Sequence, residues 1–204
     1  MKIDPKNLEW REAHDLLTSI IVPRPIAFVS TIGEDGVFNV APFSLFTGIC
    51  HTPMLAGFSI GRKRDGHKKD TLVNIESSGD FVINIVTEAL AEAMNQASKN
   101  YPSSVDEFKE VGLNPVKADI VKPPMVAESP MSMECRLVQM LEFGHAPRYN
   151  NFIIGEVLCV HIKDEFCTDG EIRPSQFRAI GRLGGTGGAA YCRTTDIFEM
   201  KRPD

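Results

Sequence analysis

Four short apolar runs separated by turn-forming residues occupy the stretch from residue 26 to residue 60. These runs are residues 26–31, 37–41, 45–49 and 54–60. Glycine and acidic residues at 33–36 are typical of a hairpin turn, and a His-Thr-Pro triplet at 51–53 separates the last two runs. Because such short turns join antiparallel neighbours, this stretch predicts an antiparallel sheet rather than a parallel one.

The rest of the chain adds strands and a few helices to this pattern. Further strands are expected at residues 81–86, 133–140 and 152–162, and helices at residues 8–17, 70–78 and from Thr87 to about Ala97. Asp70 suits the N-cap of the second helix and Gly79 its end. Residues 100–130 are rich in proline and polar residues and are expected to run over the surface. The prediction is a mainly β antiparallel barrel with flanking helices.

Length and composition narrow the class of protein. The 204 residues are expected to form a single domain, residues 1–204, with an N-terminal helical segment 1–21 packed on it. With 22 basic and 27 acidic residues the net charge is −5, which argues against partners such as nucleic acid or an anionic membrane. The charged N-terminus has no signal-peptide core, and no apolar stretch is long enough to span a membrane. A cytoplasmic protein is expected.

Cysteine and histidine spacing does not indicate a metal or disulfide framework. The five cysteines are scattered and none forms a CxxC pair, so we expect small buried hydrophobic side chains in a reducing compartment. The five histidines show no HxxxH or HExxH spacing, which leaves a metal site only through long-range convergence. There is no GxSxG motif and no marked carboxylate pair. We therefore predict no metal ligands, and no sequence feature favours hydrolase chemistry.

A basic stretch, residues 62–71, lies immediately before the expected second helix. It carries five Lys or Arg residues and ends in Lys69, Asp70 and Thr71. A helix N-terminus offers free N–H groups and a positive dipole end, so Lys69 and the Thr71 hydroxyl could hold a phosphate there. Further candidates for the phosphate are Arg62, Lys63 and Arg182. The alternative is a solvated basic loop, and both interpretations stay open at this point.

The segment 39–46, with sequence Asn-Val-Ala-Pro-Phe-Ser-Leu-Phe, is unusual for a strand. Pro42 cannot donate to a ladder, so a break or bulge in the sheet is expected there. Such a break would free backbone groups for a planar heteroaromatic ligand, with polar groups from Asn39 and Ser44 and apolar walls from Phe43 and Phe46. A barrel corner packed by the two phenylalanines is the alternative.

A glycine cluster at residues 181–188 allows two interpretations. It lacks the GxxxxGK[ST] pattern, and it does not lead from a clear strand into a helix as a dinucleotide fingerprint requires. The cluster is therefore either a flexible loop or a place where the backbone closely approaches a ligand.

Taken in order, these segments resemble the flavin reductase-like family, whose members have an FMN-binding split β-barrel. The matching segments are residues 24–31, 39–46, 69–75, 81–84, 155–157 and 182–185, followed by Tyr191. The resemblance runs from about residue 22 to residue 203. Residues 186–190 make the spacing before Tyr191 longer than the family pattern.

The resemblance implies a split barrel of the Greek-key type, a homodimer and a bound FMN cofactor. Phosphate contacts are implied for Lys69 and Thr71, beside Asp70. The other flavin contacts that it implies are Ser30, Thr31, Asn39, Ala41, Pro42, Phe43, Ser44 and Tyr191.

The function that follows is an oxidoreductase that passes hydride from a transiently bound NADH or NADPH to flavin. Hydride transfer between stacked rings needs no obligatory protein acid or base, so no residue is expected to be catalytic. One alternative is a noncatalytic FMN-binding electron carrier or flavin-storage protein with the same fold. A second is a barrel that binds another ligand, such as haem, or none.

Overall fold

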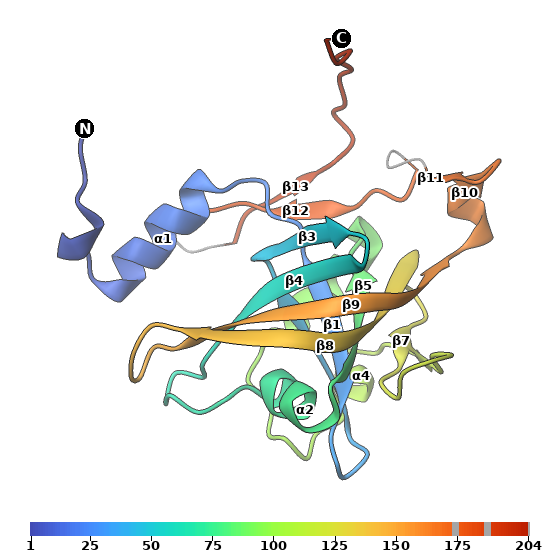
Figure 1. Ribbon diagram of the computed structural model, residues 1–204, viewed down its shortest axis with the longest axis horizontal. Coiled ribbons are helices and arrows are strands. Elements are labelled where there is room, and N and C mark those ends of the chain that lie inside the picture. Colours follow the sequence, from blue (N-terminus) through green and yellow to red (C-terminus); the bar gives the residue numbers. More distant parts are fainter. Residues whose placement is uncertain (173–175, 186–188, 204) are drawn as a thin grey trace.

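The computed structural model describes residues 1–172, 176–185 and 189–203, and its central feature is a seven-stranded sheet. The strand order is β2-β1-β5-β8-β9-β4-β3, and every neighbouring pair is antiparallel, as predicted. Figure 1 shows the strands curving around a shared interior. β2 and β3 are the two edge strands, and within the described part of the chain they do not pair with each other. The fold is therefore mainly β, and its antiparallel sheet is not closed into a barrel.

The sheet strands are β1 (Ala27–Ile32), β2 (Phe38–Phe43), β3 (Phe46–His51), β4 (Met54–Gly61), β5 (Asp80–Ile85), β8 (Met131–Phe143) and β9 (Asn150–Ile162). Smaller ladders join β6 (Pro115–Val116) with β7 (Met125–Val126), β10 (Cys167–Thr168) with β11 (Glu171–Ile172), and β12 (Ile180–Arg182) with β13 (Tyr191–Arg193). The helices are η1 (Pro5–Asn7), α1 (Trp10–Ile20), α2 (Asp70–Ser78), η2 (Glu88–Leu90), α3 (Ala91–Gln96), α4 (Glu107–Glu110) and η3 (Asp164–Phe166).

Most of the expected elements are confirmed, with two differences. The helix expected from Thr87 is divided into the 3₁₀ turn η2 and the short helix α3. Residues 100–130 are not purely loop, because α4 and the β6–β7 pair lie within them. These elements are too short to leave a periodic pattern in the sequence.

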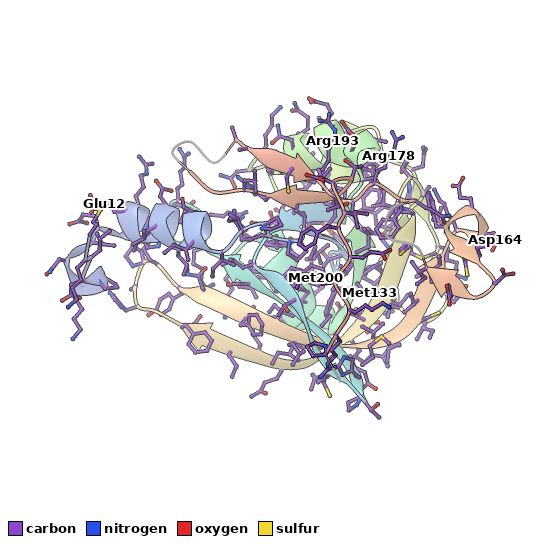
Figure 2. The ribbon with its side chains drawn as sticks, turned by 90° about the horizontal axis from the view of Figure 1, so that it is seen from above. Glu12, Met133, Asp164, Arg178, Arg193 and Met200 are labelled. Atoms are coloured by element: carbon purple, nitrogen blue, oxygen red, sulfur yellow. The ribbon has the colours of Figure 1, made fainter. Side chains whose placement is uncertain are left out.

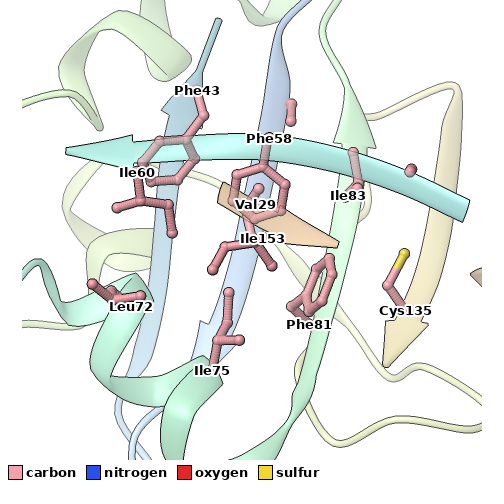
Figure 3. Close-up of a cluster of buried hydrophobic side chains, with 12 residues drawn as sticks. Val29, Phe43, Phe58, Ile60, Leu72, Ile75, Phe81, Ile83, Cys135 and Ile153 are labelled. Carbon is pink, nitrogen blue, oxygen red and sulfur yellow. The ribbon is translucent and has the colours of Figure 1, made fainter. Parts of the chain in front are cut away.

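One hydrophobic cluster fills the interior of the curved sheet. It combines side chains from six strands with Leu72 and Ile75 of α2. Figure 3 shows the phenylalanine rings of Phe43, Phe58 and Phe81 among them, with centroid separations of 5.3 Å and 5.6 Å for successive pairs. These tilted and edge-on contacts are the geometries that aromatic pairs favour. α2 therefore closes one end of the sheet with its apolar face.

A second cluster covers the opposite face of β1. Alternate side chains of this strand point to opposite faces of the sheet, so Val29 joins the interior cluster while Phe28 joins the second one. η2 and α3 contribute Leu90 and Met94, and α4 contributes Phe108. This packing places α4 and the end of α3 beside the edge strand β2.

The N-terminus of α2 differs in detail from the expected cap. The N-cap residue is Lys69, and Asp70 is the first helical residue. The Asp70 carboxylate binds the ammonium of Lys63 at 3.0 Å instead of capping the helix. Gly79 ends the helix at φ 73°, in the left-handed region, as its position after Ser78 predicts.

The expected break at Pro42 is wrong. β2 continues through Phe43 in unbroken register, with Pro42 opposite Phe28 of β1. β2 is an edge strand, and the N–H of Val40 points away from β1 to bind the carboxylate of Glu107 at 2.8 Å. The nitrogen of Pro42, two residues further along, lies on that same outer edge, where no ladder bond is lost.

α1 projects from one end of the sheet, and Figure 2 shows Glu12 on its outer part. The guanidinium of Arg24 anchors the other end of α1 by donating to the carbonyls of Thr18 and Ile21. Thr18 is nevertheless the one buried residue of this helix, and Ile20 is 69% exposed. An amphipathic helix with an uncovered apolar face is thus present at the surface.

Two further expectations concern cysteines and membranes. All five cysteines are free thiols, but only Cys135 is fully buried, and Cys167 is exposed. Burial raises the pKa of the Cys135 thiol to about 12. Among the described helices, none combines the length and apolarity needed to cross a membrane.

Candidate functional site

A cavity of about 310 Å³ lies where the edge strand β2 meets the N-terminus of α2. Ligand cavities in proteins measure about 300–1,000 Å³. Six of the eleven predicted flavin contacts line it, and these are Asn39, Ala41, Pro42, Lys69, Asp70 and Thr71. A neighbouring cavity of about 360 Å³ shares Asn39, Asp70 and Glu107 with it. The fold therefore brings two separate sequence motifs, 39–42 and 69–71, to one site.

The charged groups of this cavity are arranged for an anion. Four cations line it beside two acidic residues, Asp70 and Glu107, and the first turn of α2 opens into it; the cations are Lys63, Lys69, Lys99 and Arg182. Burial lowers the pKa of the Lys69 ammonium, an effect that Glu107 opposes and Lys63 adds to. Lysine has no acceptor with which to cap a helix, so the N–H groups at the start of α2 receive no side-chain cap from Lys69. A phosphate placed there would meet both the cation and these N–H groups.

Asn39 is the centre of a buried hydrogen-bond network. Its Oδ1 accepts from the hydroxyl of Thr71 at 2.8 Å and from that of Thr31 at 3.1 Å. Its Nδ2 donates to Glu107 Oε2 at 2.8 Å. The Thr71 hydroxyl, for which a phosphate contact was expected, is buried and donates to Asn39 in this structure. Thr71 holds β2 against α2 instead.

Glu107 is the titratable group of the site that sequence analysis missed. It is 5% exposed and accepts at Oε2 from the Val40 N–H and the Asn39 amide. Burial raises its pKa to about 7, and nearby Asp70 acts in the same direction while the two hydrogen bonds oppose it. Glu107 therefore changes charge near neutral pH at the wall of the cavity.

Glu107→Gln should make the free energy of unfolding less dependent on pH. The native pKa of about 7 exceeds the ordinary value of 4.5, so the native state holds the proton more tightly than the unfolded chain. The free energy of unfolding of the wild type should fall as pH rises from about 4.5 to about 7. A glutamine oxygen can still accept from Val40 and Asn39. Urea unfolding across this range should show a flatter profile for the variant, and equal slopes would contradict the prediction.

The remaining predicted contacts lie around the cavity or away from it. Thr31 is one hydrogen bond behind Asn39, and the ammonium of Lys69 sits 5.6 Å from the ring centroid of the buried Phe43. Ser44 accepts from Arg24 Nε at 3.4 Å.

Ser30 and Tyr191 are more distant from the cavity lining. Ser30 lies on the face of β1 opposite to Thr31, where its hydroxyl donates to the Pro124 carbonyl at 2.5 Å. Tyr191 packs against the second cluster, and the guanidinium of Arg182, which does line the cavity, lies 5.7 Å from its ring centroid.

The glycine cluster makes its close approach to α1. A Cβ on Gly184 would collide with the backbone of Thr18 and Ser19. The N–H of Gly185 donates to the Ser19 hydroxyl at 2.9 Å. The described part of the cluster therefore packs against the protein itself, whereas residues 186–188 of the insertion before Tyr191 lie outside the described residues.

Long-range convergence does bring one set of metal-capable side chains together. Ligand atoms of Glu134, Cys159 and His161 lie within 4.8 Å of one another. Both Glu134 oxygens already accept hydrogen bonds, however, from His161 and from three backbone N–H groups of residues 119–121. Glu134 therefore serves as a structural anchor that holds the backbone of residues 119–121 against β8.

Sequence analysis missed Glu107 and residues 97–101, which also line the cavity. Both lie in stretches that appear as polar surface in the sequence. Nothing in an isolated Asp-Glu-Phe-Lys-Glu segment distinguishes a buried carboxylate from a solvated one, because the burial comes from β2.

The fold and the cavity together define a class of protein. An antiparallel sheet with two free edges carries an anion-suited cavity at a helix N-terminus. A family model described as the flavin reductase like domain matches residues 19–174, and this chain belongs to the flavin reductase-like family. The resemblance found in the sequence is thereby confirmed.

Several relatives and solved structures are similar to this chain over most of its length. An uncharacterized protein of Halalkalibacterium halodurans is 36% identical over 205 residues, covering 100% of this chain and 97% of the relative. The crystal structure of nitrilotriacetate monooxygenase component B from Bacillus cereus is 31% identical, with a TM-score of 0.92 and 98% coverage of both chains. The 2-nitrobenzoate 2-nitroreductase of Pseudomonas fluorescens is 28% identical, with a TM-score of 0.88, covering 100% of this chain and 96% of that one.

Proposed function

We propose that this protein binds FMN and transfers hydride from NADH or NADPH to it. The observation that carries the proposal is the cavity at the N-terminus of α2, which Lys63 and Lys69 line. The side chain of Lys69, the N-cap residue, does not cap the backbone N–H groups of this helix end. Family membership supports a flavin ligand, and the relatives described as a monooxygenase component and a nitroreductase support flavin-linked redox chemistry. The order of the seven strands, with β2 and β3 at the two edges of the described sheet, also supports the split-barrel interpretation of this fold.

The residues present fit FMN. The phosphate needs a cation and N–H donors, which Lys69 and the first turn of α2 provide. Asp70 is paired with Lys63, so its carboxylate does not oppose the phosphate as a free charge would. Glu107 opposes it only in the ionised form.

The residues of this chain would position the flavin and the dinucleotide and would not take part in the reaction themselves. Ala41 and Pro42 form the wall from β2, and the network around Asn39 fixes this wall against α2. FMN would supply the hydride-accepting chemistry when bound. We assign no catalytic side chain, since orientation of the two rings is what the protein must provide.

Steady-state oxidation of NADH and NADPH with added FMN tests this function. Purified protein is expected to bind flavin and to show turnover that depends on both the dinucleotide and FMN. The alternative, a noncatalytic electron carrier or flavin-storage protein, predicts a flavin spectrum without turnover. Absence of any flavin binding would overturn the proposal and favour a barrel for another ligand.

We also propose that the protein is a homodimer. The apolar side chains that α1 and the following residues leave uncovered are Leu17, Ile20, Ile21 and Val22, which are 44–69% exposed. Contiguous exposed apolar surface of this kind marks an interaction site. Light scattering at micromolar concentration should give twice the chain mass, and Ile20→Asp should shift the protein toward the monomer. A wild-type monomer would contradict this prediction.

A further inference from the structure

A separate cavity, of about 370 Å³, lies at the end of the molecule where α1 approaches the turn between β8 and β9. Figure 1 shows this turn and α1 projecting at the same end of the sheet. Three segments line the cavity: the start of α1, the chain after β4 and the β8–β9 turn. Its charged lining residues are all arginines, namely Arg11, Arg62, Arg64 and Arg148.

The charge of this cavity is strongly one-sided. None of the described residues that line it is acidic. Arg62 pairs with Glu142, and among the described residues of the lining there is no carboxylate for Arg11, Arg64 or Arg148. Like charges held together raise the energy of the empty site, and an anion of more than one charge would relieve that repulsion.

Arg62 gives an independent sign of a ligand. Its side chain is only 9% exposed, although it carries a permanent charge. Its Nε is buried and has no hydrogen-bond acceptor within the part of the chain that the structure describes. A buried N–H left without an acceptor is costly, so an unpaired donor of this kind is expected where a ligand supplies the acceptor.

Two aromatic rings complete the cavity. The guanidinium of Arg148 lies 4.6 Å from the Trp10 ring centroid, and that of Arg62 lies 5.5 Å from the Tyr149 centroid. Guanidinium groups held beside aromatic rings suit a ligand that joins a planar base to phosphate groups. The guanidinium fork matches the oxygens of a phosphate, which favours a phosphate ester over a single carboxylate.

The two cavities lie on either side of one short segment. Lys63 lines the proposed flavin cavity, whereas its neighbours Arg62 and Arg64 line the arginine cavity. We propose that the arginine cavity binds the 2′-phosphorylated adenosine end of NADPH, an inference that rests on the proposed hydride transfer from a nicotinamide dinucleotide. The protein thereby selects NADPH over NADH.

The test measures ligand binding as well as turnover. Adenosine 2′,5′-bisphosphate should bind the wild type at least about tenfold more tightly than adenosine 5′-monophosphate in titration calorimetry. Arg64→Ala should remove that preference. Arg64 is exposed, so its loss should leave the fold intact. The same variant should lower the NADPH-to-NADH ratio of kcat/KM by a similar factor.

The control variant is Lys68→Ala. Lys68 is an exposed cation of the same loop that pairs with Glu76 and lines neither cavity, so its loss should change neither the binding preference nor the kcat/KM ratio.

The outcomes separate this proposal from the function on which it rests. Equal affinity for the two adenosine phosphates, or a preference that survives in Arg64→Ala, overturns the arginine site even if NADH and NADPH are both oxidised. A bisphosphate preference that depends on Arg64 supports the site even if the protein oxidises neither dinucleotide. In that case the proposed hydride transfer fails and the binding site stands.

Discussion

Glu134→Ala should destabilise the protein by about 3 kcal/mol or more. The carboxylate is fully buried in β8 and accepts from the backbone N–H groups of Asp119, Ile120 and Val121 at 2.7–2.9 Å. Alanine would leave the buried N–H of Val121 and the part-buried N–H groups of Asp119 and Ile120 without their acceptor. An unsatisfied buried donor costs about 1–3 kcal/mol, and the removed carboxylate would also leave a cavity. Urea unfolding of the variant and the wild type at neutral pH measures the difference.

Glu128→Ala is the matched control. Glu128 also accepts from a backbone N–H, that of Asn114 at 3.2 Å, but this hydrogen bond is exposed to solvent. Water can replace an acceptor at an exposed site, so its loss should cost less than about 1 kcal/mol. Equal destabilisation by the two variants would contradict the anchoring role of Glu134.

The same anchor predicts an acid-sensitive fold. Burial alone would raise the pKa of Glu134, but hydrogen bonds from His161 and the three N–H groups together hold it below its ordinary value of 4.5. A lowered native pKa contributes stability that is present above 4.5 and is lost as pH falls through the native value.

Lys69→Ala should weaken FMN binding by about tenfold or more, while riboflavin affinity stays unchanged. An FMN phosphate carries about −1.5 to −2 charges at neutral pH. Its charge-assisted hydrogen bonds contribute about 1.5–3 kcal/mol each, and about 1.4 kcal/mol corresponds to tenfold in affinity. Riboflavin has the same ring system without the phosphate. Fluorescence titration with both ligands therefore separates the loss of a phosphate contact from general damage.

Thr71→Val provides the opposite pattern. Its hydroxyl donates to Asn39 and not into the cavity, so removing it should lower stability and weaken both ligands together. Lys68→Ala, at an exposed neighbouring lysine, should affect neither. Equal losses of FMN and riboflavin in Lys69→Ala would show that Lys69 acts on structure alone. Unchanged affinities would place the phosphate elsewhere, with Arg182 the next candidate.

Local patterns predicted most of the elements because each depends on neighbouring residues. The turn at 33–36 and Gly79 ending α2 follow from backbone preferences of single residues, and both are present. Pro42 shows where this reasoning fails. A proline predicts a break in a central strand, but its cost vanishes at an edge, and the position of β2 in the sheet depends on all seven strands.

The sequence by itself determined the antiparallel class, the family and the motifs around Asn39 and Lys69. Each of these is encoded in residue type and short-range spacing. Only the tertiary structure decided that Glu107 is buried against β2 and titrates near neutral pH. Only the structure also gathered Arg11, Arg62, Arg64 and Arg148 from three distant segments into one cavity. The physical reason is that burial and clustered charge arise from contacts between residues far apart in the chain, which no local pattern records.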